Sequence, residues 1–310
     1  MIVHKDMAAL PAFRNAVITV GTFDGVHHGH QHLIQHIRKR AAEIKGESVL
    51  ITFDQHPRAV VYPDDPTLRI LSTREEKIEL LQALKVDHLV FVPFTREFSK
   101  LPARDYVDQF LVGKFRPSII AIGYNHQFGH HRDGNIELLR KLASALKFEV
   151  EEISKQMVDE IEVSSTRIRI ALTEGDVHTA AQLLGHPYSL CGKVVKGNQL
   201  GRKFGYPTAN IAVADPFKLI PADGVYAIRA TANQQQLDGV ASIGFRPTVN
   251  GRHRTVEAFL FDFEGDLYDS ELKISFVDWL RPEVKFETVD LMIAAIEKDV
   301  EQSKSILSQR

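Results

Sequence analysis

The chain has 310 residues, of which 44% are hydrophobic and 25% are charged, and its formal net charge is −2. This length and composition are typical of a globular protein with about two domains and a sizeable buried core. The near-neutral charge excludes a general electrostatic attraction to nucleic acid or to an anionic membrane surface.

The clearest motif of the first half is the segment Gly21-Thr22-Phe23-Asp24-Gly25-Val26-His27-His28-Gly29-His30. It follows an apolar, β-branched run over 16–20 and precedes a helical pattern of apolar residues over 33–37. A strand, a glycine-rich turn and a helix N-terminus together form the usual geometry for binding a phosphate. His27 and His30 bracket Gly29 where the predicted helix begins, and imidazoles there can donate hydrogen bonds to developing negative charge.

Two common phosphate-binding motifs do not fit this segment. It lacks the Gly-Lys-Ser/Thr ending of a P-loop, and it lacks the Gly-x-Gly-x-x-Gly pattern of dinucleotide-binding folds. The pattern therefore favours transfer of a phosphoryl or nucleotidyl group by a different kind of enzyme. The alternative is a turn whose two histidines are solvated or bind an incidental metal.

Predicted strands and helices alternate through the rest of the first half. We expect strands over 48–53, 88–92, 118–122 and 148–153, and helices over 73–84, 103–112 and 136–146. The helix over 73–84 opens with a capping box, Thr73 to Glu76. Alternation with continuous apolar strands predicts a parallel sheet that is covered on both faces. Sites in such sheets lie at the carboxyl ends of strands, which the loops 21–30, 54–58 and 123–134 directly follow.

Three other segments could contribute to a site. The loop over 123–134 can wrap a base or sugar while Arg132 meets a phosphate, although an ordinary surface loop is the alternative. Ser164-Ser165-Thr166-Arg167 offers hydroxyls, backbone N–H groups and a cation at the start of a short helix, with a plain N-cap as the alternative. For 54–58 a turn is the default interpretation.

The second half consists mostly of predicted strands. A short helix over 176–184 and a joint at 185–188 come first. We expect strands over 190–195, 225–230, 237–243, 256–261 and 272–280, and an amphipathic helix over 288–300. Short antiparallel strands with one terminal helix predict a small barrel.

The barrel half contains a glycine-rich, basic segment over 192–210 that suits a backbone-lined phosphate pocket. Thr208 and Asn210 alternate in an extended stretch, so their side chains point the same way and offer oxygen ligands that suit Mg²⁺. Glu257 lies among apolar residues of a strand and could be the general base for a substrate hydroxyl. The alternative for Glu257 is an outward-facing acid on an alternating strand.

The chain resembles the bacterial bifunctional riboflavin kinase/FAD synthetase family over nearly its full length. In the first half, His27-His28-Gly29-His30 is similar to the nucleotidyltransferase signature His-x-Gly-His, and 164–169 is similar to the second phosphate-binding motif. In the second half, the similar segments are 201–210 with its Pro-Thr-Ala-Asn motif, 242–248, 262–268 and 280–286.

The resemblance implies a fold and two reactions. The implied fold is a Rossmann-like nucleotidyltransferase domain with a parallel sheet over 1–184, followed over 185–310 by a small antiparallel β-barrel of the riboflavin kinase type with a terminal helix. Riboflavin and ATP would give FMN in the second domain, and FMN with ATP would give FAD and pyrophosphate in the first. ATP, riboflavin and FMN are the implied substrates, and Mg²⁺ is the implied cofactor.

The resemblance also implies roles for individual residues. It makes Glu257 the preferred base for the ribityl 5′-hydroxyl, places Mg²⁺ on Thr208 and Asn210, and assigns His27 and His30 to the phosphates of ATP. The adenylyltransferase nucleotide site is expected at Gly21, Thr22, Phe23, Asp24, Gly29, Ser164, Ser165, Thr166 and Arg167, and its flavin loop at Asn125, Phe128 and Arg132. The kinase nucleotide site is expected at Gly192, Lys193, Gly197, Gly201, Lys203 and Gly205, and its flavin site at Arg281 and Glu283.

Five residues, in four departures, differ from the family pattern. Gln55 replaces a usual proline, Asn125-His126 replaces Asp-Phe, Phe259 replaces a common histidine and Asp269 replaces a glycine. The first two departures touch the synthetase half, so a second hypothesis is a riboflavin kinase whose first domain is only a nucleotide-binding or regulatory module. A third hypothesis, a nucleic-acid-binding protein, is disfavoured by the near-neutral charge.

The sequence also bears on location. Cys191 is the single cysteine, which excludes an intramolecular disulfide and a multi-cysteine zinc site and suits a reducing cytoplasm. No apolar run reaches the roughly 18 residues of a membrane span, and the first residues lack the apolar core of a signal peptide. We therefore expect a cytoplasmic enzyme with small-molecule partners and without nucleic-acid or membrane binding. A homo-oligomer is compatible with the sequence but is not specified by it.

Overall fold

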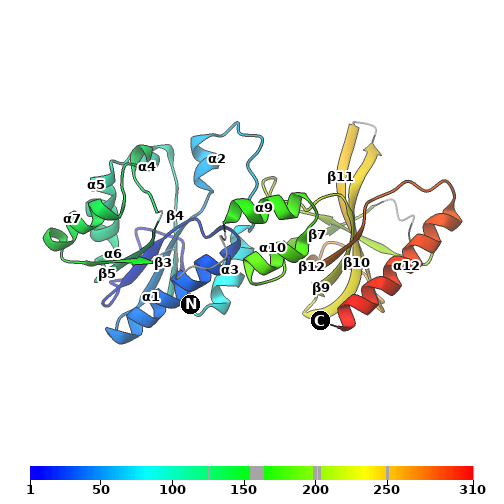
Figure 1. Ribbon diagram of the computed structural model, residues 1–310, viewed down its shortest axis with the longest axis horizontal. Helices are drawn as coiled ribbons and strands as arrows, with labels where there is room; N and C mark the ends of the chain where they lie inside the picture. Colours follow the sequence, from blue (N-terminus) through cyan, green and yellow to red (C-terminus); the bar gives the residue numbers. More distant parts are fainter. Residues whose placement is uncertain (125, 154–163, 198–200, 202–203, 249–250, 310) are drawn as a thin grey trace. The chain divides into compact units, whose positions relative to one another are not determined.

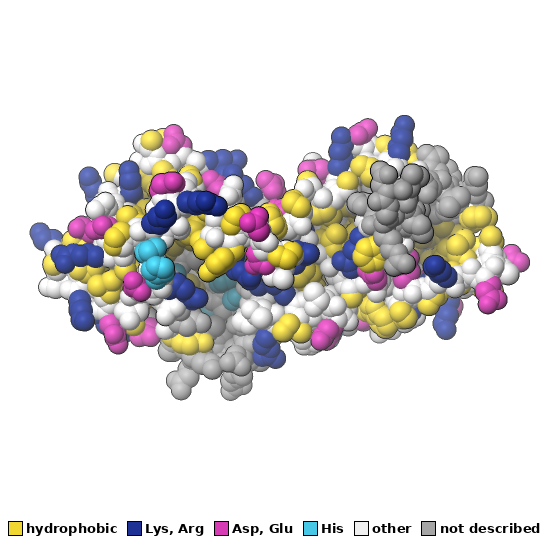
Figure 2. Space-filling model, turned by 90° about the horizontal axis from the view of Figure 1, so that it is seen from above, with side chains coloured by type: hydrophobic (Ala, Val, Ile, Leu, Met, Phe, Trp, Pro, Cys, Tyr) yellow, Lys and Arg dark blue, Asp and Glu magenta, His cyan; other side chains and the backbone are white. Residues whose placement is uncertain are grey.

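The structure, a computed structural model, describes residues 1–124, 126–153, 164–197, 201, 204–248 and 251–309. The chain forms two compact units, Met1–Ser164 and Ser165–Arg310, each with its own sheet (Figure 1). On the face drawn in Figure 2, acidic and basic side chains are interspersed, as the near-neutral composition predicts. None of the described helices has the length and hydropathy of a membrane-spanning segment.

The first unit is built on the predicted parallel sheet. Its strands are β1 (Ile2–His4), β2 (Val17–Val20), β3 (Ser48–Phe53), β4 (His88–Val92), β5 (Ile119–Gly123) and β6 (Glu149–Ile153). They lie in the order β1-β4-β3-β2-β5-β6, and every neighbouring pair is parallel. The chain order reverses between β2 and β5, so the loop over 21–30 emerges at the switch point where α/β sheets bind ligands. Sequence analysis did not find β1, because three residues are too few to show a strand pattern.

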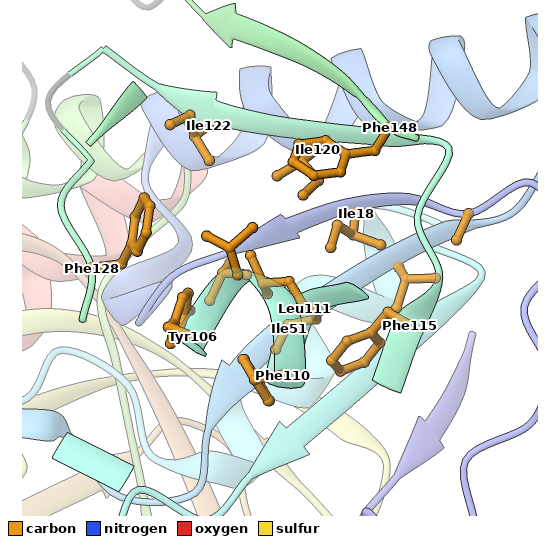
Figure 3. Close-up of a cluster of buried hydrophobic side chains, with 14 of the residues drawn as sticks. Ile18, Ile51, Tyr106, Phe110, Leu111, Phe115, Ile120, Ile122, Phe128 and Phe148 are labelled. Carbon is orange, nitrogen blue, oxygen red and sulfur yellow. The ribbon is translucent and has the colours of Figure 1, made fainter. Parts of the chain in front are cut away.

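Apolar clusters cover both faces of this sheet, as predicted. On one face, Val17 and Leu50 pack with Ile34 and Ile37 of helix α1 (His28–Glu43). On the other face, the strands pack against the helical segment 103–115, whose aromatic rings fill the cluster drawn in Figure 3. That cluster includes Ile18, Ile51, Tyr106, Phe110, Leu111, Phe115, Ile120, Ile122, Phe128 and Phe148.

The other helices of the first unit include the predicted ones over 73–84, 103–112 and 136–146 and several shorter segments that were not predicted. They are η1 (Asp24–Val26), α2 (Pro57–Val61), α3 (Arg74–Ala83), α4 (Arg96–Ser99), α5 (Ala103–Asp105), η2 (Tyr106–Val112), α6 (Gly113–Phe115), η3 (His130–Arg132) and α7 (Ile136–Leu146). The predicted capping box between Thr73 and Glu76 begins α3. Helix α2 stands where a turn was the default, because His56 caps it and a proline opens it. The helix expected over 103–112 is π-helical over Tyr106–Val112.

The second unit is the predicted small barrel. It comprises β7 (Ser189–Val195), β8 (Thr208–Ala212), β9 (Gly224–Ala232), β10 (Gln235–Thr248), β11 (Gly251–Leu260) and β12 (Glu271–Arg281), closed in the order β10-β11-β8-β7-β12-β9. Neighbouring strands of this barrel pair antiparallel. Helices α9 (Ser165–Thr173) and α10 (Val177–Leu184) precede the barrel, and α12 (Val289–Ser308) follows it.

The terminal helix α12 continues beyond the predicted end at Val300. Its buried face extends through Ser303 and Leu307, so packing against the barrel carries the helix further than the amphipathic pattern indicated. Arg281 at the end of β12 binds both carboxylate oxygens of Asp299 over 2.7–3.2 Å. Asp299 is buried, so this bidentate pair fastens α12 to the barrel.

Substitution Asp299→Ala should destabilise the second unit by about 2 kcal/mol, because it leaves the Arg281 guanidinium without its carboxylate. The loss is smaller than for a fully buried pair, since the Arg281 side chain is 25% exposed. Trp279 in β12 is the single tryptophan, so urea unfolding followed by tryptophan fluorescence reports on this unit. The control is Glu301→Ala on an exposed position of α12, and equal effects of the two substitutions would contradict the assignment.

Candidate functional site

The loop after β2 turns sharply before α1 begins. Phe23, Gly25 and Val26 have φ angles of 47°, 79° and 44°, all in the left-handed region. A bulky or β-branched residue in this region costs about 1–3 kcal/mol, and such strain gathers at functional sites. The loop therefore keeps its shape only because its surroundings hold it.

Asp24 is the main contact that holds this loop. Its buried Oδ1 accepts hydrogen bonds from the backbone N–H groups of Leu71 and Ser72 at 2.8 and 3.1 Å. The Ser72 hydroxyl in turn accepts the Gly25 N–H at 3.0 Å, and the Gln31 amide donates to the Val26 carbonyl at 2.9 Å. These contacts give Asp24 a structural role in shaping the loop, while its expected contact with ATP stays a prediction.

His27 and His30 stack on one another at the N-terminus of α1. Their ring centroids lie 3.6 Å apart with an angle of 16° between the planes, and His27 Nδ1 accepts the His30 N–H at 3.4 Å. Burial, the neighbouring His27 and the Lys77 ammonium together hold the pKa of His30 well below its usual value. His30 is therefore a neutral imidazole at physiological pH.

This pair has the donors that phosphate binding requires. Because Nδ1 of His27 accepts a hydrogen bond, a neutral His27 ring carries its proton on Nε2 and can donate it. Among the described residues, Nδ1 of His30 is enclosed and makes no hydrogen bond. The first N–H groups of the 16-residue helix α1 add the positive end of its dipole. Sequence reasoning correctly placed both histidines together at a helix N-terminus.

The loop over 123–134 is anchored by Phe128. Its ring is buried and stacks on Tyr106 with centroids 5.2 Å apart, and its backbone pairs with Gly134 in both directions at 3.1 and 2.9 Å. Burial and, as a smaller effect, the charge of the exposed Arg132 lower the pKa of His126 to about 4. The predicted flavin-loop residue Asn125 lies outside the described residues. Direct flavin contacts of this loop stay a prediction.

The second predicted phosphate motif forms a helix start as expected. Ser165, Thr166 and Arg167 form the first turn of α9 in the second compact unit, and Ser164 is the last residue of the first unit. Their contact with ATP stays a prediction.

A second cluster of polar side chains lies on the barrel around Glu257. Glu257 on β11 is directly opposite Asn210 on β8, and the Thr208 hydroxyl donates to its Oε2 at 3.1 Å. The Thr255 hydroxyl lies 3.5 Å from the other carboxylate oxygen, Oε1. Glu257 is only 8% exposed, so the alternative of an outward-facing acid is wrong. Thr208, Asn210 and Glu257 share one face, as the alternation of β8 predicted for the first two.

Two glycines make room for this cluster. A Cβ on Gly197 would collide with the Asn210 amide, whose Cγ would lie 2.8 Å away. A Cβ on Gly201 would collide with the Tyr206 carbonyl, which leads into Thr208. These two positions therefore need glycine because the chain passes close to the polar cluster, in agreement with a closely approached backbone pocket.

The other kinase residues expected from sequence lie in varied settings. Gly192 packs closely on β8, where a Cβ would lie 2.5 Å from the Ala212 carbonyl oxygen, and Gly205 has a left-handed φ of 84°. Lys193 is exposed and pairs with Asp269 at 2.9 Å. Lys203 lies outside the described residues.

The two expected flavin-binding residues of the barrel contact different partners. Arg281 is bound to Asp299 of α12. The Glu283 carboxylate occupies the space that a Cβ on Gly244 would fill. The Gly244 carbonyl lies 3.4 Å from the Thr255 hydroxyl, so Glu283 is linked through Gly244 to the surroundings of Glu257. Their contact with flavin stays a prediction.

The structure gives a physical reason for one departure from the family pattern. Asp269 has a left-handed φ of 64°, which explains why glycine suits this position, and aspartate tolerates that conformation better than most residues. Phe259, another departure, is opposite Thr208 in the barrel and packs edge-on against Tyr206 with centroids 5.3 Å apart.

Sequence reasoning missed several residues that contact the predicted ones, and Lys77 and Thr255 are two of them. Lys77 on α3 donates to the Thr22 carbonyl at 2.7 Å, and Thr255 lies beside Glu257. The only available signal for Thr255 was its position two residues before Glu257 on the same strand, which places both side chains on one face. A lysine in an amphipathic helix carries no such signal.

Comparisons with known proteins cover both units. A family model described as FAD synthetase matches residues 10–167, and one described as riboflavin kinase matches residues 184–307. The chain is 35% identical to a bifunctional riboflavin kinase/FMN adenylyltransferase of Haemophilus influenzae, covering 95% of each chain. It is 36% identical to one of Listeria monocytogenes, covering 95% of this chain and 93% of the relative.

A solved structure is also similar over the whole chain. It is described as a macrolide-efflux protein from Streptococcus pneumoniae, is 31% identical and has a TM-score of 0.88, with 98% of each chain covered. That description names a different activity from the one that the curated relatives share.

Substitution Asp24→Ala should loosen the loop after β2, because two buried N–H groups lose their acceptor. Each such loss costs about 1–3 kcal/mol, so the amides of Leu71 and Ser72 should exchange with solvent at least about tenfold faster. Hydrogen exchange measured residue by residue tests this. The matched control is Asp6→Ala, which removes an exposed carboxylate that accepts the Ala8 N–H at 2.8 Å. Unchanged exchange at Leu71 and Ser72 would contradict the structural role of Asp24.

Proposed function

The chain belongs to the family of bifunctional riboflavin kinases/FMN adenylyltransferases, and on that premise we propose how its residues divide the two reactions. The enzyme phosphorylates riboflavin with ATP to FMN, and then joins FMN to the adenylyl group of a second ATP to give FAD and pyrophosphate. Residues 1–184 carry the adenylyl transfer and residues 185–310 the phosphorylation. The observation that supports this most strongly is the Glu257, Thr208 and Asn210 cluster on one face of the barrel.

In the kinase reaction, Glu257 acts as general base. Its carboxylate already accepts a hydrogen bond from the Thr208 hydroxyl, so it can also act as the acceptor for the riboflavin 5′-hydroxyl. As the proton moves to Glu257, the ribityl oxygen bonds to the γ-phosphorus of ATP and the bond to ADP breaks. Glu257 is only 8% exposed, which keeps bulk water away from this proton transfer.

The same cluster fits a Mg²⁺ ion. Mg²⁺ prefers oxygen ligands and is usually held by few protein groups together with substrate phosphates and waters. A hydroxyl from Thr208 and an amide oxygen from Asn210 next to one carboxylate match that preference. Among the described residues, no cluster of three or more His, Cys, Asp and Glu side chains offers a dedicated metal cage. When bound, the ion would neutralise charge on the phosphates of ATP.

In the adenylyl transfer, the loop after β2 binds the phosphates of ATP. A phosphate oxygen of FMN attacks the α-phosphorus while the bond to pyrophosphate breaks, so negative charge grows on the leaving group. The His27 and His30 rings and the N-terminus of α1 donate hydrogen bonds to that charge. No covalent intermediate with the enzyme is needed, so positioning and charge stabilisation supply the rate.

We infer from the composition that the enzyme works in the cytoplasm, where its single cysteine stays reduced. Its partners are then the small molecules ATP, riboflavin and FMN. A homo-oligomer stays a prediction, which sedimentation of the purified protein would test.

The two activities should separate by substitution. Glu257→Gln removes the base and should lower the rate of FMN formation by at least about 10², while FMN-to-FAD conversion persists. His30→Ala should do the reverse, because one oxyanion-type donor is commonly worth about 10²–10³ in rate. Chromatography of riboflavin, FMN and FAD after incubation with ATP and Mg²⁺ measures both.

The control for Glu257→Gln is Glu271→Gln, an exposed acid on β12, which should leave both rates unchanged. Near-normal kinase turnover in Glu257→Gln would show that the base assignment is wrong. Wild-type protein that makes FMN but no FAD would support the second hypothesis, in which the first domain only binds nucleotide or regulates.

Substitution Gly197→Ala should impair the kinase through Asn210. The new methyl group needs the space of the Asn210 amide, so the amide must move away from the Glu257 face. We expect the KM for ATP with Mg²⁺ to rise about tenfold or more, with FMN-to-FAD conversion by the same polypeptide as the internal control. An unchanged KM and kcat for riboflavin phosphorylation would contradict the role given to Asn210.

A further inference from the structure

Lys77 reaches from α3 to the first turn of the loop after β2. Its ammonium donates a hydrogen bond to the Thr22 carbonyl at 2.7 Å. The buried Thr52 hydroxyl at the end of β3 donates to the same oxygen at 3.2 Å. The Thr22 carbonyl is therefore held from two sides, and Thr22 is the residue directly before the strained turn at Phe23.

The charges around this contact are arranged in pairs. Arg74, one turn before Lys77 on α3, binds Asp54 at 3.0 Å and lies over the Phe91 ring at 4.5 Å. Burial lowers the pKa of Lys77, and the carboxylates of Asp24 and Asp54 offset part of that effect. Asp24 already accepts backbone N–H groups and Asp54 already pairs with Arg74. The Lys77 ammonium therefore lies among charged groups whose positions are fixed by other contacts.

We propose that Lys77 is a positioning residue for adenylyl transfer: it clamps the Thr22 carbonyl, so that the loop and its histidine pair are fixed against α3. The proposal deepens the function proposed for this site and rests on it. Nothing in the sequence pattern assigned Lys77, which is one of several polar residues on an amphipathic helix.

Two consequences follow from the geometry. The clamp aligns the turn from which the N–H groups of the loop and of α1 point towards a bound phosphate. The positive charge also disfavours a second cation on His30, whose pKa is lowered by burial, by His27 and by Lys77 in that order. The other charged groups beside this site are Asp24 on η1, Asp54 after β3 and Arg74 on α3. Lys77 thus helps keep His30 a neutral donor.

The experiment compares Lys77→Met and Lys77→Arg with the wild-type enzyme. Lys77→Met keeps the apolar stem but removes the ammonium, so His30 should gain a proton at higher pH. If neutral His30 is the active form, activity is lost as the pH falls through the pKa of His30. Removing the Lys77 charge raises that pKa, so activity is then lost at a higher pH. We expect the acid limb of kcat/KM for ATP in FMN-to-FAD conversion to shift up by about one pH unit.

The size of the effect should also depend on pH. At high pH, Lys77→Met should lose about tenfold in kcat/KM from the missing clamp alone, and the loss should grow as the pH falls. Lys77→Arg keeps the charge, so its acid limb should coincide with that of the wild type. Riboflavin phosphorylation by the same polypeptide serves as the internal control, and Lys141→Met, an exposed lysine on α7, as the matched substitution.

A second measurement does not depend on turnover. The ring signals of His30, assigned by their absence in His30→Gln, are titrated by NMR, and Lys77→Met should raise the apparent pKa of His30. An unchanged His30 pKa and an unshifted acid limb in Lys77→Met would overturn the proposal. A loss of kcat/KM that is equal at every pH and is not restored in Lys77→Arg would also overturn it. If the wild type makes no FAD, the proposed function fails, while the NMR titration still decides whether Lys77 acts on His30.

Discussion

Asp24 is the contact on which the first site depends, because it holds a turn that would otherwise relax. Three residues of that turn have left-handed backbone, and two of them carry large side chains. At about 1–3 kcal/mol for each strained residue, the turn needs compensation of several kcal/mol. A buried carboxylate that accepts two backbone N–H groups, with the Ser72 and Gln31 contacts beside it, supplies compensation of that order.

The consequence of this strain is a histidine pair with fixed geometry. The turn places His27 at the N-cap of α1, and His30, three residues later, stacks on the His27 ring. Two imidazoles at 3.6 Å cannot both be charged without strong repulsion, and Lys77 adds a third positive group nearby. With His30 neutral, this site would offer an anion ring N–H groups and the positive end of the α1 dipole rather than a pair of charged imidazoles.

The barrel builds its site in a different way. There the constraint is space, because the backbone passes so close to the Asn210 amide that a side chain at position 197 would displace that amide. Strand pairing then supplies the rest, because direct opposition of β11 and β8 puts Glu257 and Asn210 on one face and lets Thr208 reach the carboxylate. The polar groups are thus fixed by sheet register, and a one-residue shift of β11 against β8 would put Glu257 on the opposite face from Thr208 and Asn210.

The limits of sequence reasoning follow from these two constructions. Period and alternation predicted the parallel sheet, the barrel and the shared face of Thr208 and Asn210, because those features depend on residues that are near in sequence. Alternation could not decide which face of β11 is buried, so Glu257 stayed open until strand pairing was known. Lys77 and Asp24 act on segments tens of residues away, and no local pattern records such a contact. The same separation explains why we expect a substitution on α3 to affect the proposed reaction at the loop after β2. Lys77 of α3 donates a hydrogen bond to the Thr22 carbonyl of that loop, so this contact couples the helix to the loop.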